Sequence, residues 1–154
     1  MNPDKLRLLR SELDNLDKAA AYLAASIERS SGLAGCSDLG DDDLERLESM
    51  ASRFARLSDL LVQRVMRLVD DIELTPGGSL LDRIQRAEKR GWVHDAQDLV
   101  RIRELRNLVA HEYAADRMAE IYSGIARLAP SLLVVVPKVR AYAEDLAKRF
   151  GSPP

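Results

Sequence analysis

Apolar residues recur every three or four positions along most of the chain, a spacing that predicts α-helices. The first such stretch covers residues 6–27 and predicts a helix of about six turns with one buried face. Its apolar stripe consists of Leu6, Leu9, Leu13, Leu16, Ala20, Leu23 and Ile27. Serine and glycine residues follow, so residues 33–40 are expected to form a loop.

A second long helix is expected from about residue 43 to about residue 74 on the same spacing. Thr75-Pro-Gly-Gly78 ends it, because proline and two glycines continue a helix only at a high cost. Ser79 and Asp82 stand three positions apart, as in a capping box. They predict the start of a short third helix that ends at Gly91.

The last third of the chain is predicted to contain several shorter helices. A fourth helix is expected from about residue 95 to about 113, and a fifth from 116 to about 128. Pro130 is acceptable in the first turn of the next segment, whereas Pro137 predicts a kink or a break. Residues 139–150 form a final amphipathic stretch.

These elements predict an all-α fold, an antiparallel helical bundle with two long helices plus several shorter ones. The 154 residues, 46% of them hydrophobic, supply one core, so residues 1–154 are expected to form a single domain. The tail, 151–154, is expected to fray. The N-terminus does not resemble a signal peptide, and no run approaches the roughly 20 apolar residues of a membrane span. We therefore expect a cytoplasmic protein without a membrane segment.

Charge and composition limit the chemistry that the chain can perform. The net charge of −2 excludes nucleic-acid binding through bulk positive charge, so any RNA contact requires a local patch. The single cysteine, Cys36, excludes an internal disulfide and a thiolate zinc site. Three successive aspartates, 41–43, are interpreted as helix-start residues rather than a metal cluster. No metal and no cofactor are expected.

Residues 101–113 differ from the other polar stretches, because three arginines, an asparagine, a histidine and a tyrosine crowd together there. Histidine side chains titrate near neutral pH, so His111 can act as an acid or a base. Arg106 keeps its charge and can bind two phosphate oxygens, and Asn107 can bind phosphate or orient the imidazole. These residue types suit RNA cleavage without a metal, which needs proton transfer and a cation at the phosphorane.

The pattern Arg106-Asn-Leu-Val-Ala-His111-Glu-Tyr113 resembles the HEPN superfamily, and within it the HepT-like toxins of HEPN/MNT toxin–antitoxin pairs. The clear resemblance covers about residues 79–113. It implies a HEPN-like bundle, metal-independent endoribonuclease activity with Arg106 and His111 as catalytic residues, and a homodimer with a composite site. It also implies neutralisation by an MNT-type nucleotidyltransferase antitoxin, with Tyr113 as a candidate for AMP transfer.

The expected helix through residue 113 gives a separate argument for the dimer. At about 100° per residue, Arg106 and His111 lie roughly 140° apart around one helix. One helix therefore does not easily direct both side chains at one phosphate, whereas two copies across a twofold axis could do so. A helix that ends just before His111 would relax this argument.

Ordinary structural roles stand beside each functional one. His111 could cap helix carbonyls, Arg106 could form a surface ion pair with a nearby acid, and Tyr113 could be a core aromatic residue. Arg101 and Arg103 could extend an RNA-binding face or could simply be solvated. The alternative function is a non-catalytic HEPN partner or substrate-binding module of a nucleotidyltransferase, since fold alone does not determine function. A helical bundle with no site is the third hypothesis.

Overall fold

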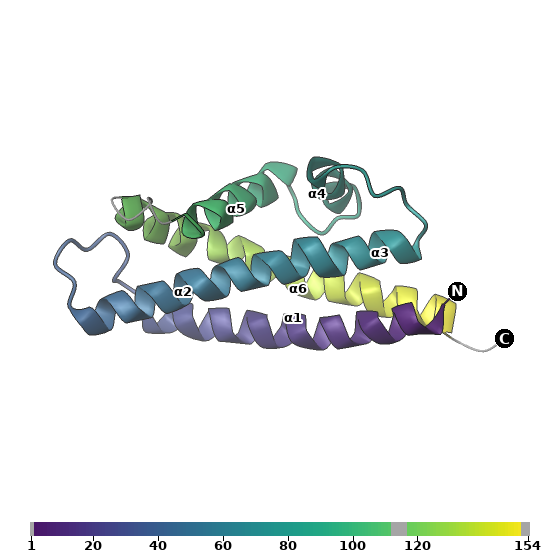
Figure 1. Cartoon of the computed structure of the whole chain (residues 1–154), viewed down its shortest axis with the longest axis horizontal. Helices are drawn as coiled ribbons and strands as arrows, with labels where there is room; N and C mark the ends of the chain where they lie inside the picture. Colours follow the sequence, from purple (N-terminus) through teal and green to yellow (C-terminus); the bar gives the residue numbers. More distant parts are fainter. Residues whose placement is uncertain (1, 112–116, 152–154) are drawn as a thin grey trace.

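The computed structural model describes residues 2–111 and 117–151, and these form an all-helical structure (Figure 1). Its elements are α1 (Pro3–Arg29), α2 (Asp41–Asp59), η1 (Leu60–Val65), α3 (Met66–Ile72), α4 (Leu80–Lys89), α5 (Ala96–Val109) and α6 (Met118–Gly151). The described ranges contain no strand. The predicted all-α helical bundle is therefore confirmed.

Three long helical rods form the body of the bundle, and two shorter helices cover one side of it. α1 contacts α2 and α6 along its length, while α5 lies against α2 and α6, and α4 against α5 (Figure 1). The core fills the space between these helices. Its largest fully buried side chains include Leu9, Leu16, Leu23, Leu47, Met50, Phe54, Leu57, Leu61, Met66, Leu99, Ile102 and Ile121. Each buried side chain of this size stabilises the fold by about 1.5–3 kcal/mol.

Two helix starts follow the local sequence closely. The Asn2 side chain accepts a hydrogen bond of 2.9 Å from the backbone N–H of Asp4, which caps α1. At α4, the Ser79 hydroxyl accepts from the N–H of Asp82 at 3.1 Å, and the Asp82 carboxylate accepts from the N–H of Ser79 at 2.9 Å. The predicted capping box is thus confirmed.

The second predicted helix is a continuous rod of α2, η1 and α3, but its middle is not α-helical. Residues 60–65 form a π-helix, in which each turn takes up an extra residue. No feature of the apolar pattern predicts this widening. It begins directly after Asp59, and π-helical segments often occur at functional sites.

The prediction of separate C-terminal helices is wrong, because α6 runs unbroken across Pro130 and Pro137. Both prolines are exposed, so the lost backbone hydrogen bonds and the ring contacts fall on the solvent side. The opposite face buries Leu132, Val136 and Val139, and this packing holds the helix together. Gly151, expected in a frayed tail, is the last residue of α6, and residues 152–154 lie outside the described part.

The unbroken α6 also bears on whether the chain contains a helix long and apolar enough to cross a membrane. By length and composition it is apolar enough to cross a membrane, whereas the sequence divided at its prolines contains no such run. The core helix of a soluble protein meets the same criterion. In this structure the buried face of α6 lies against α1, α2 and α5, as a core helix does.

Candidate functional site

Helix α5 carries the residues that the sequence analysis selected. Asp95 caps its start by accepting a 2.9 Å hydrogen bond from the N–H of Gln97, and Leu99 and Ile102 bury its inner face. The helix ends at Val109, and the next two N–H groups bond to carbonyls three residues back. This tight last turn leaves His111 exposed, just beyond the end of the helix.

The end of α5 corrects the prediction of a helix through residue 113. Because His111 follows the helix, the rotation of 100° per residue no longer relates its side chain to that of Arg106. The angular separation of about 140° therefore does not apply, and the geometric requirement for two subunits does not follow from it. Helix geometry therefore gives no separate argument for the homodimer.

Arg106 forms a two-pronged ion pair with Asp59 on α2. Its Nε donates to Oδ1 at 2.7 Å and its Nη2 to Oδ2 at 2.8 Å. The side chain of Arg106 is 25% exposed, so one edge of the guanidinium still meets solvent. Among residues 2–111 and 117–151, no group accepts a hydrogen bond from its Nη1. Asp59 thus holds the guanidinium in one orientation while leaving donors available.

Arg103 shares the same carboxylate but is a structural residue. It is only 6% exposed, and its Nη1 donates to Asp59 Oδ1 at 2.8 Å and to the Ser58 hydroxyl at 2.9 Å. A guanidinium that is buried and bonded in this way cannot reach a strand of RNA on the surface. Both roles that the sequence left open for Arg103, an extension of an RNA-binding face and a simply solvated side chain, are therefore wrong.

The two arginines determine the ionisation of Asp59. Burial alone would raise the pKa of this carboxyl group. The hydrogen bonds from Arg106 and Arg103, together with their positive charges, outweigh burial and lower the pKa below its ordinary value. The same ion pair raises the pKa of Arg106, against the opposing effect of burial. Asp59 therefore stays negative and Arg106 positive throughout the neutral pH range.

The other predicted residues lie on the surface near the end of α5 or outside the described part. Asn107 is exposed. Arg101 is also exposed, and its Nη1 lies 3.7 Å from the carboxylate of Asp98 one turn earlier. Tyr113, the candidate for modification, lies outside the described residues. Arg106 and Asn107 thus lie near the end of α5, and His111 lies just beyond it.

A shallow groove of about 380 Å³ adjoins Arg106 between α2, α5 and α6. Glu48, Ser52 and Tyr122 are among the other residues that line it. Burial, together with the negative charge of Glu48, raises the pKa of the Tyr122 phenol, so this group stays protonated at neutral pH. The groove offers a guanidinium, a phenol and a carboxylate to whatever enters it.

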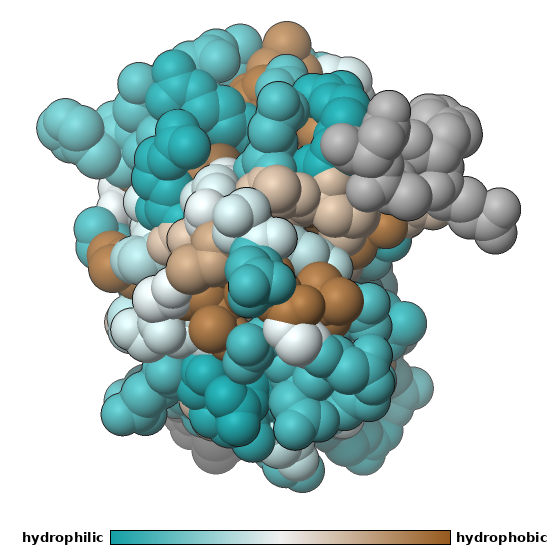
Figure 2. All heavy atoms as spheres, turned by 90° about the vertical axis from the view of Figure 1, so that its left-hand side faces the viewer, coloured by the Kyte–Doolittle hydropathy of each residue, from teal (hydrophilic) through white to brown (hydrophobic). Residues whose placement is uncertain are grey.

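The end of the molecule beside this groove has a mixed surface. Figure 2 shows a band of hydrophobic side chains across the end where α1 finishes and α2 and α6 begin, with hydrophilic surface above and below. Partly exposed apolar residues from this end include Leu33, Leu39, Leu44 and Met118.

Within the described ranges, no group of three or more His, Cys, Asp or Glu side chains is arranged to hold a metal ion.

Three site residues were not identified from the sequence, namely Asp59, Glu48 and Tyr122. Asp59 reaches Arg106 across 47 positions of sequence, so no local spacing could have paired them.

A comparison of the chain with protein-family models, curated proteins and solved structures finds no match.

Proposed function

We propose that the protein is a metal-independent endoribonuclease toxin of a type II or type VII-like toxin–antitoxin pair. In this proposal Arg106 and His111 cleave RNA in a composite cleft of a homodimer, with Asn107 in support. An MNT-type nucleotidyltransferase antitoxin neutralises the toxin by transferring AMP from ATP to the Tyr113 hydroxyl, which releases pyrophosphate. The added negative group would repel RNA phosphate and block the cleft.

The observation that carries this proposal is the orientation of Arg106 by Asp59 in the last turn of α5, a helix that ends just before the exposed His111. A guanidinium whose direction is set before substrate arrives can stabilise charge on a phosphorane without first reorganising. The imidazole at the end of α5 can exchange a proton with the ribose hydroxyl or the leaving oxygen. Arg106 would therefore bind the phosphate and His111 would move the proton.

The hydrophobic band in Figure 2 supports the dimer part of the proposal. Exposed apolar surface at one end of a helical bundle favours association, and twofold pairing is the commonest symmetric form. Because His111 is exposed at this same end, a second subunit docked there would form one cleft from both copies of the motif.

One observation favours the alternative, a non-catalytic partner or substrate-binding module of a nucleotidyltransferase. Asp59 already occupies the Nε and Nη2 side of Arg106, and it neutralises the charge that a phosphate would require. An arginine held in this way also has a purely structural use, since it joins α5 to α2. The two functions differ in whether the purified protein cuts RNA.

The test compares wild type with His111→Ala, Arg106→Lys and the control Arg127→Lys, an exposed arginine on α6 that does not line the groove. Each protein is incubated with labelled RNA in the presence of EDTA. We expect the wild type and Arg127→Lys to cleave the RNA and His111→Ala to leave it intact. Arg106→Lys should cleave much less, because lysine keeps the positive charge but cannot form the paired hydrogen bonds of a guanidinium. Intact RNA with the folded wild type would refute the nuclease and favour the binding module.

A second measurement addresses the antitoxin. Co-expression with the partner nucleotidyltransferase should increase the intact mass of the chain by whole AMP units, and Tyr113→Phe should abolish the increase. An unchanged mass in co-expressed wild type would refute the modification while leaving the nuclease proposal intact.

A further inference from the structure

Two neighbouring hollows lie along the face between α1 and the α2–η1–α3 rod. The first has a volume of about 570 Å³ and is lined by Lys18, Tyr22, Arg56 and Arg64 among others. The second has a volume of about 460 Å³ and also contains Arg64. Because Arg64 lines both, the hollows are adjacent, and we call the two together the α1–α2 groove.

The acids of the α1–α2 groove are each neutralised by a neighbouring cation. The pairs are Glu12 with Arg64 at 3.5 Å, Asp59 with Arg106 at 2.7 Å, Asp70 with Arg86 at 2.7 Å, and Asp71 with Lys5 at 2.9 Å. Three of these four partners, Arg106, Arg86 and Lys5, do not line the groove, so most of the cations that line it keep their own charge. The groove is consequently positive although the whole chain carries a charge of −2.

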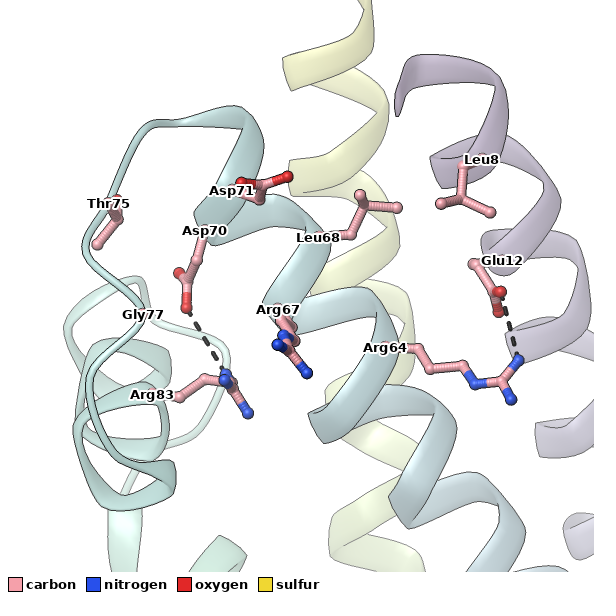
Figure 3. A pocket seen from close by; sticks show the side chains of 10 residues that line it. All are labelled: Leu8, Glu12, Arg64, Arg67, Leu68, Asp70, Asp71, Thr75, Gly77 and Arg83. Carbon is pink, nitrogen blue, oxygen red and sulfur yellow. Dashed lines mark hydrogen bonds and ion pairs between the residues drawn. The ribbon is translucent and has the colours of Figure 1, made fainter. Parts of the chain in front are cut away.

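Three cations lining the groove have no acidic partner. Lys18, Arg56 and Arg67 make no ion pair with any residue in the described ranges. In Figure 3 the guanidinium groups of Arg83 and Arg67 lie near one another in the second hollow, whereas that of Arg64 points away from them toward Glu12 on α1. Like charges placed so close together repel one another, and a bound anion would relieve this repulsion.

Arg83 shows that the positive charge here is incompletely satisfied. Its Nε is buried without a hydrogen-bond partner and lies 3.8 Å from a carboxylate oxygen of Asp70, which is already bonded to Arg86 and Arg90. Burial lowers the pKa of Arg83, and the charges of Arg67 and Arg86 lower it further against the opposing effect of Asp70. An anion in the second hollow would offset these effects.

An exposed aromatic ring lies at the far end of the groove. Tyr22 is 54% exposed, and the guanidinium of Arg53 lies 5.3 Å from its ring centroid. Arg53 donates to the Tyr22 carbonyl at 2.9 Å and to the Ser26 hydroxyl at 2.7 Å, so its position beside the ring is fixed. From Leu8 in the second hollow to Tyr22, α1 rises by about 21 Å.

We propose that the α1–α2 groove binds a single strand of nucleic acid, with its phosphates on Lys18, Arg56, Arg64 and Arg67 and a base stacked on Tyr22. A row of cations along a groove, ending at an exposed ring, is how proteins hold single strands without reading their sequence. The choice of RNA rests on the proposed function. Asp59 belongs to the wall of the groove and holds Arg106, so the strand would pass next to the candidate site.

The test measures binding of a fluorescein-labelled single-stranded RNA of 12 nucleotides to the full-length chain carrying His111→Ala, so that cleavage does not interfere. Arg56→Gln with Arg67→Gln, which removes two charges, is compared with Arg127→Gln on α6, which removes one charge away from the groove, and Tyr22→Ala is measured separately. The double variant should bind RNA at least about tenfold more weakly. The slope of the logarithm of its binding constant against the logarithm of the salt concentration should become shallower by about 1.4, since each lost phosphate contact to a single strand accounts for about 0.7. Tyr22→Ala should weaken binding about tenfold.

The outcomes separate the groove from the nuclease. RNA binding that these variants weaken supports the groove even if the wild type cuts nothing, in which case only the proposed function fails. Equal binding by the double variant and by Arg127→Gln, with both chains folded by circular dichroism, overturns the groove even if His111-dependent cleavage is observed. A third outcome also overturns the proposed RNA-binding groove. In it, poly-glutamate of equal charge and concentration displaces the RNA, and Tyr22→Ala has no effect on RNA binding. The groove would then bind acidic chains in general.

Discussion

Replacing Asp59 by asparagine tests whether the Asp59 carboxylate joins α2 to α5. In the wild type, Arg103 Nη1 and Arg106 Nε converge on Oδ1 at 2.8 and 2.7 Å, and Arg106 Nη2 reaches Oδ2 at 2.8 Å. Asparagine presents an NH₂ group on one side, so at least one arginine N–H would face another donor. It also leaves Arg103, which is 6% exposed, without a counter-charge.

The expected loss of stability in Asp59→Asn follows from how deeply Asp59 and its arginine partners are buried. Removing one member of a buried ion pair costs about 3–5 kcal/mol, and exposed pairs contribute about 0–1 kcal/mol. The side chain of Asp59 is 32% exposed and that of Arg103 is 7% exposed, so the pair lies nearer the buried case. We expect Asp59→Asn to lower the free energy of unfolding by about 2–3 kcal/mol and the melting temperature by about 5–10 °C.

The assay is urea unfolding followed by circular dichroism at several pH values. Asp145→Asn is the control, because it removes the same charge from an exposed pair with Arg149 and should cost at most about 0.5 kcal/mol. Since folding lowers the pKa of Asp59, its stabilisation is complete above the unfolded pKa of about 4 and is lost as the pH falls through the lower, folded pKa. The gap between wild type and Asp59→Asn should therefore be full at pH 7 and narrow towards pH 3. Equal losses in the two variants, or a gap that does not narrow in acid, would refute the reasoning.

Two further substitutions test other parts of the fold. Asp70→Asn should destabilise the protein by about 3–5 kcal/mol in the same unfolding experiment, because Asp70 is 2% exposed and accepts charged hydrogen bonds from Arg86 and Arg90. A loss below about 1 kcal/mol would show that this cluster contributes little. Pro137→Ala should stabilise the protein by about 1–2 kcal/mol, since it allows the missing α6 hydrogen bond and removes an exposed ring. An unchanged or lower melting temperature would mean that the proline contributes packing or a bend that the fold needs.

Local pattern predicted much of the fold. The apolar stripe of α1, the capping box at Ser79 and Asp82, and the end of the second rod before Pro76 all depend on residues within a few positions of one another. Such interactions can be read from the sequence because helix geometry brings neighbours three and four apart onto one face. The same rule failed at Pro130 and Pro137, where tertiary packing on the opposite face overrode a local penalty.

The candidate site likewise has a part that the sequence predicted and a part that it did not. His111, Asn107 and Arg106 were selected from the sequence because their types and spacing form a recognisable pattern. Their surroundings were not predicted, including the early end of α5, the burial of Arg103 and the π-helical segment beside Asp59. The α1–α2 groove likewise combines Lys18 and Tyr22 from one helix with Arg56 and Arg67 from another rod.

The sequence by itself determined that this chain forms amphipathic helices, where most of them begin, and which short segment carries reactive side chains. Only the tertiary structure decided which charges meet. Asp59 and Arg106 are 47 positions apart, and their pairing depends on how α5 settles against α2. Backbone periodicity acts over one or two turns, whereas an ion pair forms wherever packing brings two side chains within a few ångströms.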